Sequence, residues 1–175
     1  MKKISKSTLV VIISIAVLVT AVAVFAFLNA DDIGKKQEME MNAEFMIKYG
    51  DASWTITMQD MLDLEPVEFN TTMDTSTTDP TQVVFSGVEL KTICESIGLD
   101  ISSSEVFEVR ALDGYSSALK LDEVMEDGNV YICISMNEEP LKIKSEGGKG
   151  PYMMVIKSAQ FSQRWCKFVQ EIDIR

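Results

Sequence analysis

Phe85-Ser86-Gly87-Val88-Glu89-Leu90 carries the clearest local signal in this sequence. Ser86 stands three residues before Glu89, so the serine hydroxyl can accept from the glutamate amide while the carboxylate accepts from the serine amide. This capping box predicts that a helix begins here, and Gly98 is suited to end it. Apolar residues at helical spacing supply the stripe that such a helix would bury: Val88, Leu90, Ile93, Cys94 and Ile97.

Short β-forming runs flank this segment on both sides. Strands are predicted at residues 45–49, 67–72, 106–112, 130–135 and 152–156, and residues 165–174 are predicted to close the chain as a strand or strand pair. Thr57 with Asp60 predicts a second short helix that Pro66 closes, and residues 122–126 predict a third. Residues 73–81 and 145–151 are expected to be loops. Strands outnumber helices without a βαβ alternation, which predicts a mixed α+β domain.

The N-terminal part of the sequence indicates a membrane anchor. Residues 9–28 contain no charge and no proline, and at about 1.5 Å per residue they can span the ~30 Å hydrocarbon core of a bilayer. Lysines precede this segment and aspartates follow it: Lys2, Lys3, Lys6, Asp31 and Asp32. The positive-inside rule therefore predicts a cytoplasmic stub at 1–8, a transmembrane helix at 9–28 and an extracytoplasmic remainder at the cell membrane. The alternative is a cleaved signal and a secreted domain. Residues 29–42 are polar and predict a linker to a domain at 43–175.

The composition excludes several classes of function. The sequence has no histidine, which removes the Ser-His-Asp triad, the Cys-His dyad, the usual zinc sites and histidine-ligated haem. The three cysteines, Cys94, Cys133 and Cys166, form no CxxC pair. After residue 30 the chain carries all 27 acidic residues and 13 of its 16 basic ones, a net charge of −14. Such a surface repels phosphates, so nucleic acid is not expected as a partner.

Two further groups of residues could bind a metal ion, but each also has a purely structural explanation. The acidic residues within 122–127 lack the alternating oxygen-ligand spacing of a calcium loop, so helix capping and solvation account for them. Met39, Met41, Met153 and Met154 suit a soft metal, yet methionine is also an ordinary filler of irregular cores. We therefore assign no metal ligand from the sequence.

Five motifs follow one another between about residue 57 and residue 174. They are the segment 85–90, the turn Asp113-Gly114-Tyr115, the Asn-x-x-Pro-Leu turn at 137–141, the glycine-rich segment 147–152 and the Trp-x-Lys segment at 165–169. This order resembles the molybdopterin-binding domain of the sulfite oxidase family of oxidoreductases. The resemblance implies the mixed-sheet fold of that family with short helices. It also implies that Asp113, Gly114, Tyr115, Gly147 and Gly148 lie on the side of the domain that holds a molybdenum–pterin cofactor in family members.

The chain departs from that family at the residues that carry the chemistry. Catalytic members hold the metal with a cysteine thiolate shortly after the strand that matches 67–72, whereas residues 73–76 here read Met-Asp-Thr-Ser. A hydroxyl cannot replace a thiolate as a soft, deprotonated ligand at neutral pH, and Cys94 is expected to face the core. The family's phosphate-binding arginines and its histidine are also missing, and the relevant loops offer Arg110, Lys149 and Arg164. We add Lys149 and Arg164 to the candidate cofactor-binding residues and assign no catalytic residue.

Three hypotheses about function follow from the sequence. The first is a membrane-anchored, non-catalytic module that uses the former cofactor face to bind a small anionic ligand or a protein partner. The second is a molybdopterin-dependent oxidoreductase subunit with an atypical cofactor site. The third is a structural surface domain. An ordered pocket lined by Asp113, Tyr115 and Lys149 would favour the first hypothesis over the third.

Overall fold

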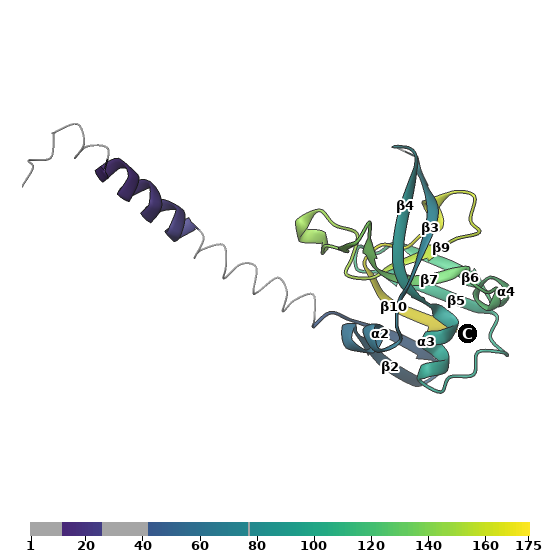
Figure 1. Ribbon diagram of the computed structural model, residues 1–175. Helices are drawn as coiled ribbons and strands as arrows, with labels where there is room; N and C mark the ends of the chain where they lie inside the picture. Colours follow the sequence, from purple (N-terminus) through teal and green to yellow (C-terminus); the bar gives the residue numbers. More distant parts are fainter. Residues whose placement is uncertain (1–11, 26–41, 77) are drawn as a thin grey trace, which may run out of the picture. The chain divides into compact units, whose positions relative to one another are not determined.

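A computed structural model describes residues 12–25, 42–76 and 78–175 (Figure 1). The chain divides into two compact units, Met1–Met39 and Glu40–Arg175. Residues 12–25 are helical, and among the described residues no helix has both the length and the apolar character needed to cross a membrane. The predicted stub at 1–8 lies outside the described residues, as do parts of the predicted span at 9–28 and of the linker at 29–42.

Two five-stranded sheets build the second unit. The first sheet is mixed, because β1 and β10 pair in parallel while its other neighbours are antiparallel. Its strand order is β2 (Ala52–Thr57), β1 (Glu44–Tyr49), β10 (Val169–Ile174), β5 (Val106–Ala111) and β6 (Ser116–Lys120). The second sheet is antiparallel, with β3 (Val67–Thr75), β4 (Thr78–Glu89), β7 (Val130–Met136) and β8 (Glu139–Pro140) in order, and β9 (Met153–Ile156) paired with β7.

Short helical segments connect these strands. They are α2 (Met58–Asp63), α3 (Leu90–Ser96), α4 (Leu121–Met125) and the 3₁₀ turns η1 (Lys144–Glu146) and η2 (Ser162–Arg164). This architecture confirms the predicted mixed fold with short helices. One hydrophobic core lies between the two sheets, with Phe45 and Phe107 from the first sheet and Phe85 and Ile132 from the second. Four consecutive residues at the start of β7 are buried, as predicted for a central strand.

The helix predicted at Ser86 begins four residues later, and the serine cap is wrong. Strand β4 continues through Glu89, and α3 starts at Leu90 without a side-chain cap. Ser86 pairs with Ser135 of β7, and a Cβ on Gly87 would lie 2.5 Å from the Ile132 carbonyl oxygen. The glycine therefore permits a close approach of two backbones within a sheet. The hydrogen bonds of that ladder replace the local capping bonds.

The loop predicted at 73–81 is also wrong, since β3 and β4 fill most of it and form a long hairpin (Figure 1). Strands β2 and β6 are further elements that the sequence analysis did not predict. Both are edge strands rich in serine, threonine and alanine. Strand β6 carries one large apolar residue, Leu119, and so gives a weak signal, whereas β2 alternates Ala52, Trp54 and Ile56 with serine and threonine, a strand pattern that was present in the sequence.

The predicted cap of α2 is confirmed and gives a first testable expectation. The Thr57 hydroxyl accepts from the Asp60 amide at 3.2 Å, and the Asp60 carboxylate accepts from the Thr57 amide at 2.8 Å. Replacing Thr57 with alanine should lower the free energy of unfolding by about 1 kcal/mol, because one helix amide loses its acceptor. Chemical denaturation measures this loss. Thr57→Ser is the control and should stay near wild type, and an equal loss in both variants would contradict the capping role.

Candidate functional site

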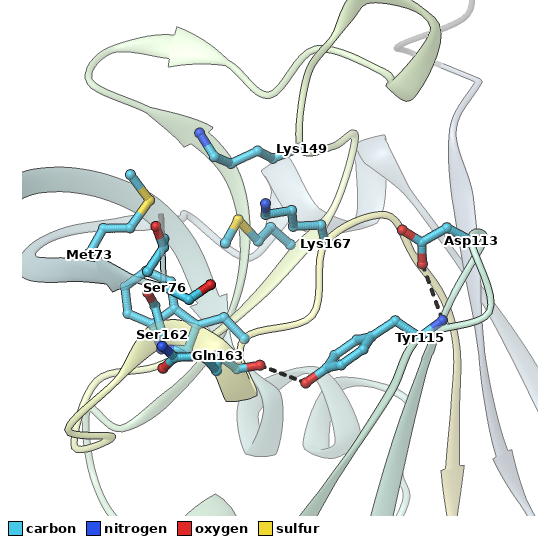
Figure 2. Close-up of a pocket in the computed structure, with 11 residues that line it drawn as sticks. Met73, Ser76, Asp113, Tyr115, Lys149, Ser162, Gln163 and Lys167 are labelled. Atoms are coloured by element: carbon cyan, nitrogen blue, oxygen red, sulfur yellow. Dashed lines mark hydrogen bonds between the residues drawn. The ribbon is translucent and has the colours of Figure 1, made fainter. Parts of the chain in front are cut away.

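A pocket of about 490 Å³ opens among the loops of the second unit. It is lined by the end of β3, the β5–β6 turn, the glycine-rich segment, β9 and the segment around η2 (Figure 2). The lining residues are Met73, Thr75, Ser76, Asp113, Tyr115, Lys149, Met153, Ser162, Gln163, Trp165 and Lys167. A volume of this size suits a small molecule, since such sites typically measure about 300–1,000 Å³.

The predicted turn Asp113-Gly114-Tyr115 forms one wall of this pocket. The turn is closed by a bond from the Gly114 amide to the Ala111 carbonyl at 3.1 Å. Asp113 accepts from the Tyr115 amide at 3.2 Å, which fixes the carboxylate beside the tyrosine. The Tyr115 hydroxyl donates to the Gln163 carbonyl at 2.7 Å, as Figure 2 shows. This bond joins two loops that are far apart in sequence and holds the pocket wall in place.

Two lysines, Lys149 and Lys167, form the cationic side of the pocket. The Lys149 carbonyl accepts from the Phe168 amide at 3.0 Å, so the two loops are bonded next to the lysines, whose side chains Figure 2 labels. Lys149 is half-buried, and its ammonium group has the Met136 sulfur as a neighbour at 3.9 Å. Burial lowers the pKa of Lys149, and repulsion from Lys167 lowers it further. Within the described part of the chain, neither ammonium group forms an ion pair with a carboxylate.

Apolar side chains form the remaining surface of the pocket, chiefly Met73, Met153 and Trp165. The Trp165 indole N–H donates to the Ile156 carbonyl at 3.0 Å, so the ring offers only carbon to the pocket. The same ring packs edge-on against Phe85 with centroids 5.7 Å apart. The pocket therefore rests directly on the hydrophobic core.

The structure brings Asp113, Tyr115 and Lys149 together and places the other predicted residues elsewhere. Arg164 is not among the lining residues, and its guanidinium pairs with Glu123 at 2.6 Å and donates to the Ala118 carbonyl at 3.0 Å. Gly114 belongs to the turn rather than to the lining. Gly147 and Gly148 use their amides on the carbonyls of Lys144 and Ile143, respectively. These amides are thus occupied by the chain's own backbone.

Most of the lining residues were not predicted from the sequence, and Lys167 is the most important of them. Lys167 belongs to the Trp-x-Lys segment, so a signal for it was present in the sequence. Met73, Thr75 and Ser76 lie in the segment that aligns with the metal-binding cysteine of the family. That alignment was a second sequence signal for this pocket. Ser162 and Gln163 follow no local pattern, because only the packing of η2 against β3 brings them here.

The structure is therefore an α+β domain with two packed sheets and a loop-lined pocket. The chain belongs to the oxidoreductase molybdopterin binding domain family, whose model matches residues 35–175. Among solved structures, the chain is similar to the sulfane dehydrogenase SoxCD from Paracoccus pantotrophus, with a TM-score of 0.64 and 15% identity. That match covers 77% of this chain but only 38% of the other, so the likeness concerns the fold. A comparison with curated proteins found no match.

The pocket residues do not fit a molybdenum centre held by a thiolate. Met73, Thr75 and Ser76 offer a thioether and two hydroxyls, which are poor substitutes for a deprotonated soft ligand. Burial raises the pKa of Cys94 and of Cys166 to about 12, so both thiols stay protonated at neutral pH. Among the described residues, no group of three or more histidine, cysteine or acidic side chains is placed to hold a metal ion.

Proposed function

We propose that this chain is a non-catalytic member of the molybdopterin-binding family that binds a small anionic ligand in the pocket beside Lys149 and Lys167. The observation that carries the proposal is the pair of lysines on one pocket wall without a carboxylate partner among the described residues. Two like charges held close together are unfavourable in the empty pocket, and an anion between them relieves that repulsion.

The donor set of the pocket supports a binding role over a redox role. A catalytic molybdenum site needs a deprotonated soft ligand, and the described pocket residues include none. Arg110 in β5 forms an ion pair with Glu171, and Arg164 forms an ion pair with Glu123. Neither arginine lines the pocket. The lysines are the cations that remain for a ligand in this pocket. Because the chain after residue 30 has a net charge of −14, such a local cationic site selects anions by contact rather than by long-range attraction.

Titration with inorganic phosphate at low ionic strength tests the anion site. We expect Lys149→Gln and Lys167→Gln each to weaken phosphate binding about tenfold, the value of one charge-assisted hydrogen bond. Lys142→Gln is a matched control, because it removes the same charge from a neighbouring loop position outside the pocket lining. Equal affinity in all three variants, or no binding to the wild type, would contradict the proposal.

The same variants make a prediction about pH and stability. Because the pKa of Lys149 is lower in the folded state than its ordinary value of 10.5, the unfolded chain binds more protons in the interval between these values. The charged lysine therefore destabilises the ligand-free fold below this interval, and stability rises as the pH increases through it. We expect Lys149→Gln to raise the melting temperature at pH 7 and to flatten this rise, as calorimetry across pH 7–11 would measure.

Family membership favours one other function, a molybdopterin-dependent oxidoreductase subunit with an atypical cofactor site. Metal analysis by mass spectrometry of the protein from its native host separates the two functions. A near-stoichiometric molybdenum content would replace the binding-module proposal with this one. Absence of molybdenum in a cooperatively folding protein would support the binding module.

We also propose that residues 9–28 anchor the chain in the cell membrane with the domain on the extracytoplasmic side. The support is the uncharged apolar run, the three lysines before it and the two aspartates after it. Protease added to intact cells should digest the domain, and the chain should resist extraction from membranes with alkaline carbonate. Recovery of the chain in the carbonate-soluble fraction would contradict the anchor.

A further inference from the structure

We infer that the ligand of this pocket is a zwitterionic organic molecule, with its anionic group at Lys149 and Lys167 and an amino group at Asp113. The inference rests on the proposed anion site and narrows the class of ligand that this site takes. The inference depends on the positions of the Asp113 carboxylate and of the Lys149 and Lys167 ammonium groups in the pocket.

The Asp113 carboxylate has hydrogen-bond acceptor positions that its protein partners do not occupy. Its side chain is only one-third exposed, at 33%, although it carries a charge. One carboxylate oxygen accepts from the Tyr115 amide at 3.2 Å, and the other has the Lys144 ammonium group at 4.0 Å. A carboxylate offers about four acceptor positions, so these two partners leave some of them unused.

Asp113 and the two pocket lysines line the same pocket without pairing with one another. Figure 2 shows the carboxylate next to Tyr115 and the Lys149 and Lys167 side chains extending away from it, although the Lys167 loop adjoins the Asp113 turn through the bond from the Leu112 amide to the Phe168 carbonyl at 2.9 Å. A purely anionic ligand would satisfy the lysines but would leave the acidic group of Asp113 facing like charge. A ligand with an anionic end and an amino end satisfies both walls.

The surface beside the charged groups defines the body of the ligand. Met73, Met153 and Trp165 supply apolar contact there, and Tyr115, which is 42% exposed as a residue, also lines the pocket. The Trp165 N–H is already bonded to Ile156, so this part of the pocket has no free donor from the indole. An aromatic or aliphatic body between the two charged groups therefore fits this surface better than a polar one.

Three benzene derivatives of similar size test this inference: 4-(aminomethyl)benzoate, 4-methylbenzoate and benzylamine. They would be titrated into the full chain in a non-ionic detergent, with methionine methyl groups labelled for NMR. The methyl signals of Met73 and Met153 report binding in the pocket, and Met125, which is 46% exposed and does not line it, is the internal control. We expect 4-(aminomethyl)benzoate to bind about tenfold more tightly than 4-methylbenzoate, and benzylamine to bind most weakly.

Two variants assign the ends of the ligand. Asp113→Asn should abolish the preference for the amino compound and keep the affinity for 4-methylbenzoate at least at its wild-type value, because the amide oxygen can still accept from Tyr115. Lys149→Gln should weaken both acids about equally. Asp122→Asn makes the same change of charge outside the pocket and should preserve the wild-type preference.

The outcomes separate this inference from the anion site on which it rests. Equal or tighter binding of 4-methylbenzoate by the wild type would overturn the zwitterion while the lysine site stands. A preference for the amino compound that survives Asp113→Asn would also overturn it. Both proposals would be overturned if the methyl signals of Met73 and Met153 changed with none of the three probes and the chain also did not bind phosphate.

Discussion

Phe85→Ala should lower the free energy of unfolding by about 3–5 kcal/mol, the cost of removing a buried ring that its surroundings cannot replace. Phe85 is completely buried in β4 and contacts rings from two other parts of the chain. Its centroid lies 5.7 Å from that of Trp165 in an edge-on arrangement and 6.1 Å from that of Phe69. Since whole domains are stable by about 5–15 kcal/mol, this variant should be only marginally folded.

Chemical denaturation with two companion variants tests this expectation. Phe161→Ala removes the same ring from a side chain that is 50% exposed, and it should change stability by less than about 0.5 kcal/mol. Phe85→Leu retains much of the buried volume and should lose less than Phe85→Ala. Similar losses for Phe85→Ala and Phe161→Ala would show that Phe85 does not have the central packing role assigned to it.

Gly148→Ala is the second substitution with a large expected effect. A Cβ at this position would lie 1.8 Å from the carbonyl oxygen of Lys142 and 2.3 Å from its carbonyl carbon. These atoms are backbone and cannot rotate away as a flexible side chain could. The Gly148 amide donates to Ile143 at 3.1 Å, and the Gly150 amide donates to Lys142 at 2.9 Å, so the loop is fixed on both sides.

We therefore expect Gly148→Ala to lower the free energy of unfolding by about 3 kcal/mol, the upper part of the range for overpacking. It should also weaken phosphate binding, because the displaced loop carries Lys149. Denaturation and phosphate titration of the same preparation measure both effects. Ser145→Ala, at an exposed position of the same segment, is the control. A Gly148→Ala variant that behaves like Ser145→Ala would contradict the close-approach role of this glycine.

These two substitutions connect the core to the candidate site. Phe85 supports Trp165, whose other surface lines the pocket, and Gly148 sets the path of the loop that presents Lys149. The glycine-rich segment, which the family resemblance placed on the cofactor side, thus has a packing role in the structure. The ligand-binding role that we propose belongs to the lysine beside it.

The family resemblance, the α+β class and the features that depend on neighbouring residues could all be predicted from the amino-acid sequence. The Thr57 cap involves Asp60 three positions away, and the apolar run of β7 shows its burial directly. The Asp113-Gly114-Tyr115 turn is likewise closed within a few residues. Such features depend on local hydrogen bonds and on residue periodicity, and they can therefore be predicted from the sequence.

The start of α3, the pairing of the sheets and the set of residues that share the pocket depend on long-range packing. Pairing with β7 extends β4 through Ser86 and overrides the local cap. The pocket combines β3, the Asp113 turn and the segment after η2, and its Tyr115–Gln163 bond joins residues 48 positions apart. No local pattern specifies such a bond. It forms because burial of the common core brings distant loops to the same end of the domain, and the lysine pair follows from that packing.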